Sequence, residues 1–220
     1  MEYNRRSLEL PSNLYSWERP ENQFAHTQVC RKAIAALVAE GLYPLDGRRV
    51  LDVGCGEGRW LLEFAQWGAR AEDLYGIDLL EERIAEAKLK LPGSHLDWGE
   101  ATCLPWPNQY FDLVTQFTVF TSILDFEVKR SIAAEMIRVT RPGGAILWYD
   151  FTFNNPKNKN VRGVGLDEMR RLFPGCRIVP HKITLAPPLA RRLVPFSWTA
   201  ALALENLRLF STHCLALIQP

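Results

Sequence analysis

The sequence predicts an α/β protein in which a doubly wound, mostly parallel sheet is covered by helices on both faces. Apolar runs with strand character alternate along the chain with segments whose apolar residues recur at helical spacing, and this alternation is typical of parallel sheets with crossover helices. The first apolar run, 50–53, leads into the glycine-rich stretch 54–58. A glycine turn at the carboxyl end of a buried strand is a ligand-binding position in such sheets.

The expected helices are marked by apolar residues three or four positions apart and by residues that end helices. Gly41, Pro92-Gly93 and Pro142-Gly143-Gly144 are each expected to end one of them. The expected helices are 24–41, 61–68, 80–91, 128–139 and 166–173. The expected strands are 50–53, 75–79, 94–98, 111–117, 145–151, 176–185 and 212–218.

A long, largely apolar stretch at 186–211 separates the last two expected strands. It begins with Ala186-Pro187-Pro188 and is too long for a hairpin turn. We expect a helical insertion that forms a packed cover or a substrate lid. The other interpretation is a membrane-surface helix with Arg191 and Arg192 facing phosphate groups, and Pro195 and Glu205 count against it because they interrupt a clean amphipathic face.

Length and charge limit the classes of partner. The 220 residues suit one domain with one sizeable core. The 26 lysines and arginines nearly balance the 25 aspartates and glutamates, for a net charge of +1, so a nucleic-acid partner is not expected. No apolar run reaches the length of about 18 residues that predicts a membrane span, while peripheral membrane contact stays open. The sequence predicts no particular oligomeric state.

Cysteine and histidine usage predicts neither a disulfide framework nor a metal site. The five cysteines are an odd number without a C-x-x-C pair, and the four histidines show no metal or triad spacing. We therefore expect no metal ion. The first residues lack the apolar core of a signal peptide, and together with the cysteine usage this predicts a protein of the reducing cytoplasm.

The spacing of the glycines separates two classes of cofactor. A dinucleotide-binding turn that begins at Gly54 requires its third glycine at position 59, which is Arg59 here. Asp78 is expected at the tip of the second strand, where a carboxylate can accept hydrogen bonds from both hydroxyls of a ribose. Capping of the following helix is the other interpretation of Asp78, and the two roles are compatible.

Three motifs resemble those of the class I S-adenosylmethionine-dependent methyltransferases. They are Leu51-Asp52-Val53-Gly54-Cys55-Gly56-Glu57-Gly58, Tyr110-Phe111-Asp112-Leu113-Val114 and Arg138-Val139-Thr140-Arg141-Pro142-Gly143-Gly144. The resemblance implies a Rossmann-like, seven-stranded sheet with an antiparallel C-terminal hairpin. It also implies one domain over 1–220, with an N-terminal helical cap at 1–47, a cofactor-binding core at 48–151 and C-terminal strands at 152–220 that contain the insertion.

The resemblance implies S-adenosylmethionine as cofactor, with S-adenosylhomocysteine as product, and a set of residues that hold it. The glycines would line its methionine and ribose side, Asp78 would take the ribose hydroxyls, and Leu79 would pack on the adenine. The full set is Asp52, Gly54, Cys55, Gly56, Gly58, Trp60, Asp78, Leu79, Glu100, Ala101, Gln116 and Phe117. Glu100 stands where the family usually has Asp. Core packing is the other interpretation of Trp60 and Phe117.

The acceptor side is expected at the carboxyl ends of the fourth and fifth strands, because ligands of open α/β sheets lie there. Asp150 is the candidate catalytic residue, as a general base toward a hydroxyl or an orienting group for an amine, and capping of the following loop is its other interpretation. Tyr149 is a candidate substrate-binding residue. Tyr15 and Trp17 are candidates to close over the substrate, or to staple the first helix.

The predicted function is methyl transfer from S-adenosylmethionine to a small-molecule or glycan acceptor, with oxygen preferred over nitrogen. The segment from Tyr149-Asp150-Phe151 onward resembles bacterial methyltransferases that accompany cell-surface polysaccharide or secondary-metabolite genes. N-methylation of a small metabolite, an RNA methyltransferase and a non-catalytic binding module are the alternatives. A nicotinamide-dependent oxidoreductase is disfavoured by Arg59 in the glycine turn.

Overall fold

The computed structural model describes residues 19–154 and 158–220. By its internal contacts the chain divides into two compact units. Residues 33–181 and 213–220 form one, here called the sheet unit, and the described residues of 1–32 and 182–212 form the other, called the hairpin unit. The expectation of a single domain over 1–220 stays a prediction, and each unit is described by itself.

The sheet has seven strands in the order β3-β2-β1-β4-β5-β7-β6. The strands are β1 (Val50–Val53), β2 (Leu74–Asp78), β3 (His95–Trp98), β4 (Phe111–Phe117), β5 (Thr140–Phe151), β6 (Arg177–Leu185) and β7 (Ser211–Gln219). The pairs β1–β2, β2–β3, β1–β4 and β4–β5 are parallel, and β7 runs antiparallel to β5. The predicted doubly wound sheet with an antiparallel C-terminal hairpin is therefore confirmed.

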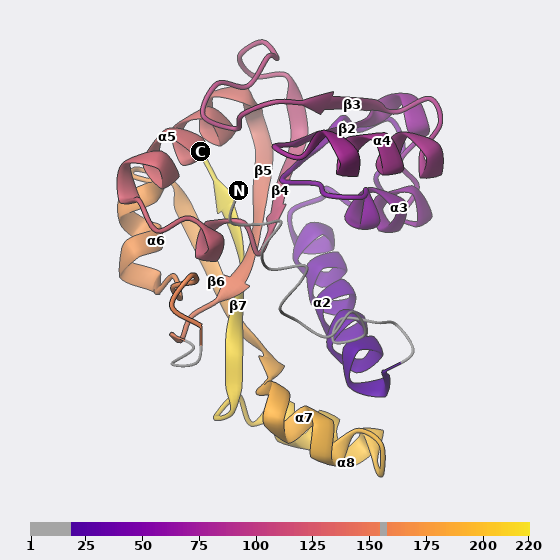
Figure 1. Ribbon diagram of the computed structural model, residues 1–220, viewed down its shortest axis with the longest axis vertical. Coiled ribbons are helices and arrows are strands. Elements are labelled where there is room, and N and C mark those ends of the chain that lie inside the picture. The colour runs from indigo at the N-terminus through magenta and orange to yellow at the C-terminus, as the bar shows by residue number, and fades with distance from the viewer. Residues whose placement is uncertain (1–18, 155–157) are drawn as a thin grey trace. The chain divides into compact units, whose positions relative to one another are not determined.

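Helices cover both faces of the sheet, as Figure 1 shows with α3 and α4 on one side and α5 and α6 on the other. The helices are α2 (Pro20–Ala39), α3 (Arg59–Gln66), α4 (Glu81–Lys90), α5 (Phe126–Val139), α6 (Leu166–Leu172), α7 (Pro187–Leu193) and α8 (Trp198–Asn206). Single 3₁₀ turns, η1 (Ala71–Asp73) and η2 (Phe120–Ser122), precede β2 and follow β4.

Two boundaries differ by more than two residues from the sequence-based expectation. β5 begins at Thr140 and not at 145, because Thr140 already pairs with Phe111 across the sheet before the register shifts. A Cβ on Gly144 would come within 2.8 Å of the Asp112 carbonyl oxygen, so glycine lets this segment lie against β4 instead of turning away. α2 begins at Pro20 and not at 24, and proline is favoured in the first turn of a helix because it lacks the N–H group that would stay unpaired there.

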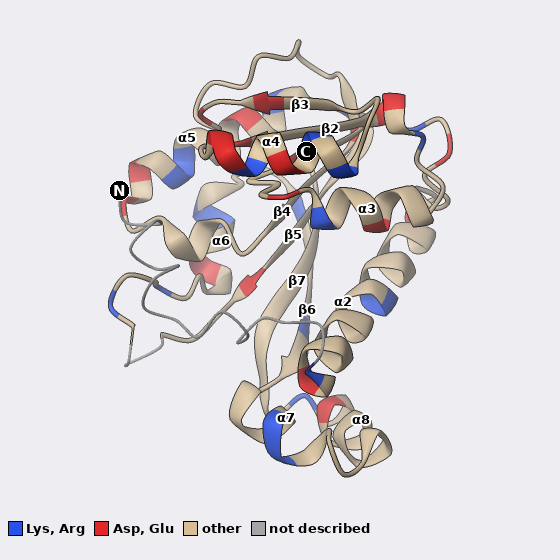
Figure 2. Cartoon of the chain, turned by 45° about the vertical axis from the view of Figure 1, so that its right-hand side comes forward, with Lys and Arg blue, Asp and Glu red and all other residues tan. Residues whose placement is uncertain are grey.

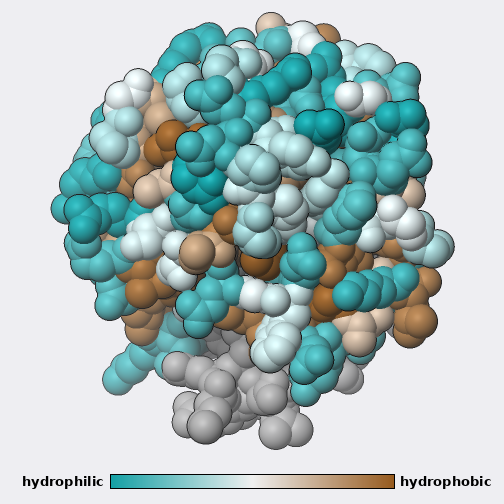
Figure 3. Space-filling view, turned by 90° about the horizontal axis from the view of Figure 1, so that it is seen from above, coloured by the Kyte–Doolittle hydropathy of each residue, from teal (hydrophilic) through white to brown (hydrophobic). Residues whose placement is uncertain are grey.

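The sheet unit is built around an apolar core between the sheet and α5 and α6. Its largest fully buried members are Phe111, Phe120, Trp148 and Phe173. β4 is buried along its whole length, as expected for a central parallel strand covered on both faces. The outer surface seen in Figure 3 is largely hydrophilic, with hydrophobic side chains in scattered patches.

The hairpin unit has a separate, smaller core. The helical insertion expected at 186–211 contains α7 and α8, joined by a short turn. The side chain of Ser197 caps α8 by accepting a hydrogen bond from the backbone N–H of Ala200. The buried apolar residues of this core are Phe24, Leu185, Ala190, Val194 and Ala201.

Candidate functional site

The glycine turn between β1 and α3 is held to the end of β2 by backbone hydrogen bonds. The N–H groups of Gly54 and Cys55 both donate to the Ile77 carbonyl oxygen, at 2.8 and 3.1 Å. Gly54, Gly56 and Gly58 have φ values of +72°, +53° and +79°, which side chains with a Cβ rarely adopt. The turn therefore brings three positions without side chains to the carboxyl edge of the parallel strands.

The three glycines are needed for different reasons. A Cβ on Gly54 would lie 2.5 Å from Val119 Cγ2, and one on Gly58 would lie 2.6 Å from Leu91 Cδ1, so both leave room for neighbouring protein. A Cβ on Gly56 would meet nothing closer than Arg83 Nη1, at 3.7 Å. The space beside Gly56 is therefore open to a ligand that approaches the backbone closely.

The carboxylate of Asp78, at the end of β2, faces this turn. Its Oδ2 accepts a hydrogen bond from the Gly56 N–H at 2.9 Å, and its Oδ1 accepts one from the Leu80 N–H at 2.9 Å. Leu80, and not Asp78, is the N-cap residue of α4. Each carboxylate oxygen keeps acceptor capacity after one such bond, so Asp78 can hold the turn and still accept two hydroxyl groups.

Asp52 lies inside the sheet unit beneath the glycine turn. Its Oδ1 accepts a hydrogen bond from the Thr115 hydroxyl at 2.7 Å, and the residue is almost fully buried. Burial raises the pKa of Asp52 to about 7, the Thr115 hydrogen bond acts against this rise, and the nearby charge of Asp78 adds to it. This placement favours support of the turn as the function of Asp52.

Cys55 contributes a backbone turn and not a reactive thiol. Its side chain is buried against β2, where a Cβ on Gly76 would come within 2.8 Å of the sulfur atom. Burial, with smaller effects of Asp52 and Asp78, raises the pKa of the thiol, so the nucleophilic thiolate is disfavoured. Gly76 is a packing requirement that the sequence did not single out.

An exposed apolar platform lies next to Asp78. Trp98 pairs with Asp78 in the parallel register of β2 and β3, and its Nε1–H donates to the Leu79 carbonyl oxygen at 3.0 Å. Leu79 and Trp98 are 64% and 62% exposed, although both are large and apolar. A flat aromatic base can pack on such side chains, which supports the expectation that Leu79 lies against adenine.

The neighbouring residues Glu100 and Ala101 follow directly after this platform. Glu100 is exposed, and its Oε2 accepts a hydrogen bond from the Thr102 hydroxyl at 3.3 Å. Ala101 is partly buried against the main core. Glu100 is therefore placed to reach a polar edge of a ligand, while Ala101 contributes packing.

Aromatic rings form a row across the ends of α3, β4, β5 and β7. Trp60 stacks on Phe117 with ring centroids 3.7 Å apart and an interplanar angle of 13°. Phe117 is 6.0 Å from Tyr149, whose ring stacks on His213 at 5.1 Å. Phe117 and Tyr149 are buried, and Trp60 packs on Phe117, so core packing accounts for these contacts.

Comparison with known proteins places this geometry in a family. Residues 50–144 match the model of a methyltransferase domain. These residues form a methyltransferase domain, and the fold around them is that of S-adenosylmethionine-dependent methyltransferases. The same seven-stranded fold occurs in magnesium protoporphyrin IX methyltransferase from Synechocystis, at 17% identity and a TM-score of 0.64 over 100% of this chain and 94% of that one. It also occurs in a methyltransferase from Mesorhizobium loti, at 20% identity and a TM-score of 0.58 over 84% and 96%.

Curated relatives match this methyltransferase domain over part of their length. A demethylmenaquinone methyltransferase of Geobacillus stearothermophilus is 35% identical over 44% of this chain and 43% of its own length. The O-methyltransferase cnsE of Penicillium expansum is 27% identical over 64% of this chain and 51% of its own. The chain thus aligns with about half the length of these relatives.

On the expected acceptor side of the methyltransferase domain, Gln116 lies behind the surface. Its amide is fully buried: Nε2 donates to the Tyr149 carbonyl oxygen at 3.3 Å, and Oε1 accepts from the Val119 N–H at 3.0 Å. The amide therefore joins the loop after β4 to the end of β5. The side chain that the sequence placed beside the cofactor instead fixes the loop after β4.

Asp150 is also fully buried and bound to that loop. Its Oδ1 accepts a hydrogen bond from the Thr121 hydroxyl at 2.5 Å, and its Oδ2 accepts one from the Thr121 N–H at 3.3 Å. Burial raises the pKa of Asp150 to about 7, and the hydrogen bonds from Thr121 act against this rise. The described contacts are those of a residue that positions the β4 loop, and proton removal from an acceptor stays a prediction.

Thr118 is the strained residue of this loop. It has a φ of +60°, directly after β4, and its N–H donates to the Tyr149 carbonyl oxygen at 2.8 Å. Such backbone conformations persist where neighbouring bonds enforce them, often at functional sites. The local sequence gives no sign of it, because it depends on pairing between β4 and β5.

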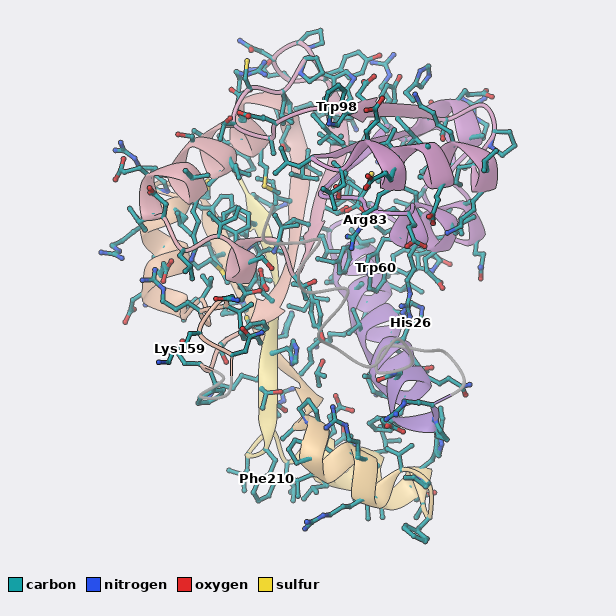
Figure 4. The ribbon with its side chains drawn as sticks, in the orientation of Figure 1. His26, Trp60, Arg83, Trp98, Lys159 and Phe210 are labelled. Carbon is teal, nitrogen blue, oxygen red and sulfur yellow. The ribbon has the colours of Figure 1, made fainter. Side chains whose placement is uncertain are left out.

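Some predicted site residues lie outside the described residues, and some site residues were missed. Tyr15 and Trp17 belong to the segment that the structure does not describe. Trp98 and Arg83 were not singled out, although Figure 4 shows them with Trp60 on the elements around the glycine turn. The sequence offered two signals for them: Trp98 ends a short expected strand, and Arg83 lies in the first turn of an expected helix.

Proposed function

We propose that this chain is an enzyme that transfers the methyl group of S-adenosylmethionine to an oxygen atom of a small-molecule acceptor. The observation that carries the proposal is the pairing of Asp78 with the Gly56 N–H beside an open position at Gly56. A carboxylate fixed next to a turn without side chains is suited to a ribose bound against the backbone. The match to a methyltransferase domain supports the same cofactor.

The residues present fit this cofactor. Asp78 would bind the ribose hydroxyls, the glycine turn would lie along the methionine part, and Leu79 and Trp98 would hold the adenine. When bound, S-adenosylmethionine supplies an electrophilic methyl group whose sulfur leaves as a neutral thioether, so no protein acid is needed. The protein's main task is to hold the acceptor oxygen in line with that methyl group, at about 3 to 3.5 Å.

The aromatic row supports an apolar acceptor that contains a ring. Trp60 is partly exposed and stacks on the buried ring of Phe117 near the carboxyl ends of the strands, and an aromatic face of this kind favours planar molecules. Relatives that are named demethylmenaquinone methyltransferases support a small-molecule acceptor, and the relative named an O-methyltransferase supports oxygen as the methylated atom. No contact among the described residues favours a glycan.

Transfer to a hydroxyl releases a proton from the acceptor oxygen, which must pass to a base or to water. Asp150 is the candidate base because it lies near the carboxyl end of β5, and to act it would have to exchange its hydrogen bonds with Thr121 for one to the acceptor. A cytoplasmic location is proposed with this function, supported by five cysteines that form no disulfide.

The experiment is a methyl-transfer assay with three classes of acceptor: quinols and phenols, amines, and sugars. We expect methylation of a hydroxyl oxygen of a quinol or phenol with equimolar release of S-adenosylhomocysteine. Methylation of a ring carbon would replace the proposed acceptor atom with carbon. Methylation of amines alone would replace the proposed acceptor atom with nitrogen. Tight binding of S-adenosylhomocysteine without turnover of any acceptor would instead favour a binding module.

A further inference from the structure

The hairpin unit carries a dense group of exposed apolar side chains. Five of the thirteen large apolar side chains that are exposed among the described residues lie between positions 196 and 210. They are Phe196, Trp198, Leu207, Leu209 and Phe210. Phe196 and Leu209 are 86% and 78% exposed. Exposed apolar residues gathered in one region mark a surface that contacts a partner or a membrane.

These outward side chains are additional to the core of the unit. The inward residues of α7 and α8 already pack with Phe24, whose ring also meets the edge of Trp198 at a centroid distance of 5.4 Å. The backbone is fixed as well, because Glu205 Oε1 accepts a hydrogen bond from the Thr184 N–H at 2.7 Å. The exposed group therefore sits on a packed scaffold.

The charged residues of this segment are almost all basic. Residues 182–212 contain Lys182, Arg191, Arg192 and Arg208 but only one acidic residue, Glu205, for a net charge of +3. All four basic residues are exposed, whereas Glu205 is buried and burial raises its pKa. Figure 2 shows basic residues on α7 and an almost uncharged α8. This segment thus presents positive charge and apolar surface without an exposed acidic residue.

We propose that the exposed side of the α7–α8 hairpin docks on a membrane surface that contains anionic lipids. Aromatic and leucine side chains enter the region between headgroups and acyl chains, while arginines bind the lipid phosphates. Phe196 lies in the turn before α8, Trp198 is its first residue, and positions 207, 209 and 210 follow its end. These positions therefore do not follow the spacing of a helix ridge. Lipid needs no matching shape, whereas a protein groove does.

The hairpin would lie on the membrane and not cross it. α7 and α8 have seven and nine residues, far fewer than the roughly 20 that span a bilayer. None of the helices within 19–154 and 158–220 combines the length and the apolar composition that a membrane span requires. The inference goes beyond the proposed function and is testable without cofactor or acceptor, so its failure is distinguishable from failure of methyl transfer.

The test is co-sedimentation of the whole chain with vesicles of phosphatidylcholine alone or mixed with phosphatidylglycerol. We expect binding to the mixed vesicles that falls as salt rises. Phe196→Ser with Leu209→Ser should lower the partition coefficient at least about tenfold. Leu89→Ser is the matched control, because Leu89 is 84% exposed on α4, and it should bind like the parent.

A second pair of variants tests the charge. Arg191→Gln with Arg192→Gln should lower binding to the mixed vesicles about tenfold and weaken its salt dependence, whereas Lys88→Gln with Lys159→Gln should not. Equal thermal unfolding midpoints show that the variants are folded, and if the serine pair is unfolded, the glutamine pair decides. Absence of parent binding at low salt, or equal losses in the controls, would overturn the proposal. So would self-association without vesicle binding, abolished by the serine pair.

Discussion

Asp78 joins the end of β2 to the glycine turn, and its replacement tests the ribose contact. Asp78→Ala would remove the charge-assisted hydrogen bonds that we propose to two ribose hydroxyls, so we expect affinity for S-adenosylhomocysteine to fall by roughly 1.5 to 3 kcal/mol. Calorimetric titration measures this change, and thermal unfolding checks the fold. Glu82→Ala, at an exposed position of α4, is the control. An affinity equal to the parent's would leave Asp78 only its bonds to Gly56 and Leu80.

Asp150 gives stability a dependence on pH that can be measured without substrate. Its pKa rises from an ordinary value of 3.8 to about 7 in the folded protein, so the folded chain holds a proton that the unfolded chain has lost between these values. Its contribution to stability is full below the ordinary carboxyl range and is lost as the pH rises to about 7. Between pH 4 and pH 7, the free energy of unfolding should therefore fall less in Asp150→Asn than in the parent. Some fall remains in the variant, because Asp52 also has a raised pKa. Chemical denaturation at a series of pH values measures this difference. Equal falls in the free energy of unfolding of the parent and the variant would contradict the raised pKa of Asp150.

At the residue scale, the sequence predicted the residues that short motifs mark. It missed the residues whose contacts depend on pairing between strands. The glycines and Asp78 follow from a short motif, and the structure brings them together. Trp98 reaches Asp78 through the register of β2 and β3. The inward orientation of Gln116 follows from the carbonyl oxygen of Tyr149, 33 positions later. No local pattern contains that information.

At the scale of the element, two glycine variants distinguish a contact with the ligand from a general effect of backbone strain on stability. Gly56 and Gly47 both have positive φ, and an added Cβ would meet nothing within 3.4 Å at either position. Gly56→Ala and Gly47→Ala should thus lower the free energy of unfolding by similar amounts, about 1 to 2 kcal/mol. Only Gly56→Ala should weaken binding of S-adenosylhomocysteine, by at least about tenfold. Equal affinities of the two variants, measured by titration, would place the ligand elsewhere.

Element types were predictable from periodicity, whereas some boundaries were not. Strand and helix alternation predicted the sheet, and the structure confirms it. The Pro-Gly-Gly sequence after α5 suggested a turn, but pairing of Thr140 with Phe111 makes it part of β5. Pairing between distant segments therefore overrides a local turn preference at this point.

For the whole molecule, average composition concealed an uneven distribution of charge. The net charge of +1 gave no reason to expect an anionic partner, yet residues 182–212 alone carry +3. The sequence did single out this insertion and its two adjacent arginines. It could not show which apolar residues of the hairpin unit are buried and which are exposed, because Val194 and Ala201 are buried by packing with Phe24, which is distant in sequence.

The central claim is that the site at Gly56 and Asp78 binds S-adenosylmethionine and not a dinucleotide. Calorimetric titration of the whole chain with S-adenosylhomocysteine and, separately, with NAD tests it most directly. The account predicts saturable binding of S-adenosylhomocysteine and much weaker or no binding of NAD, because Arg59 replaces the third glycine of a dinucleotide turn. Tighter binding of NAD than of S-adenosylhomocysteine would contradict it.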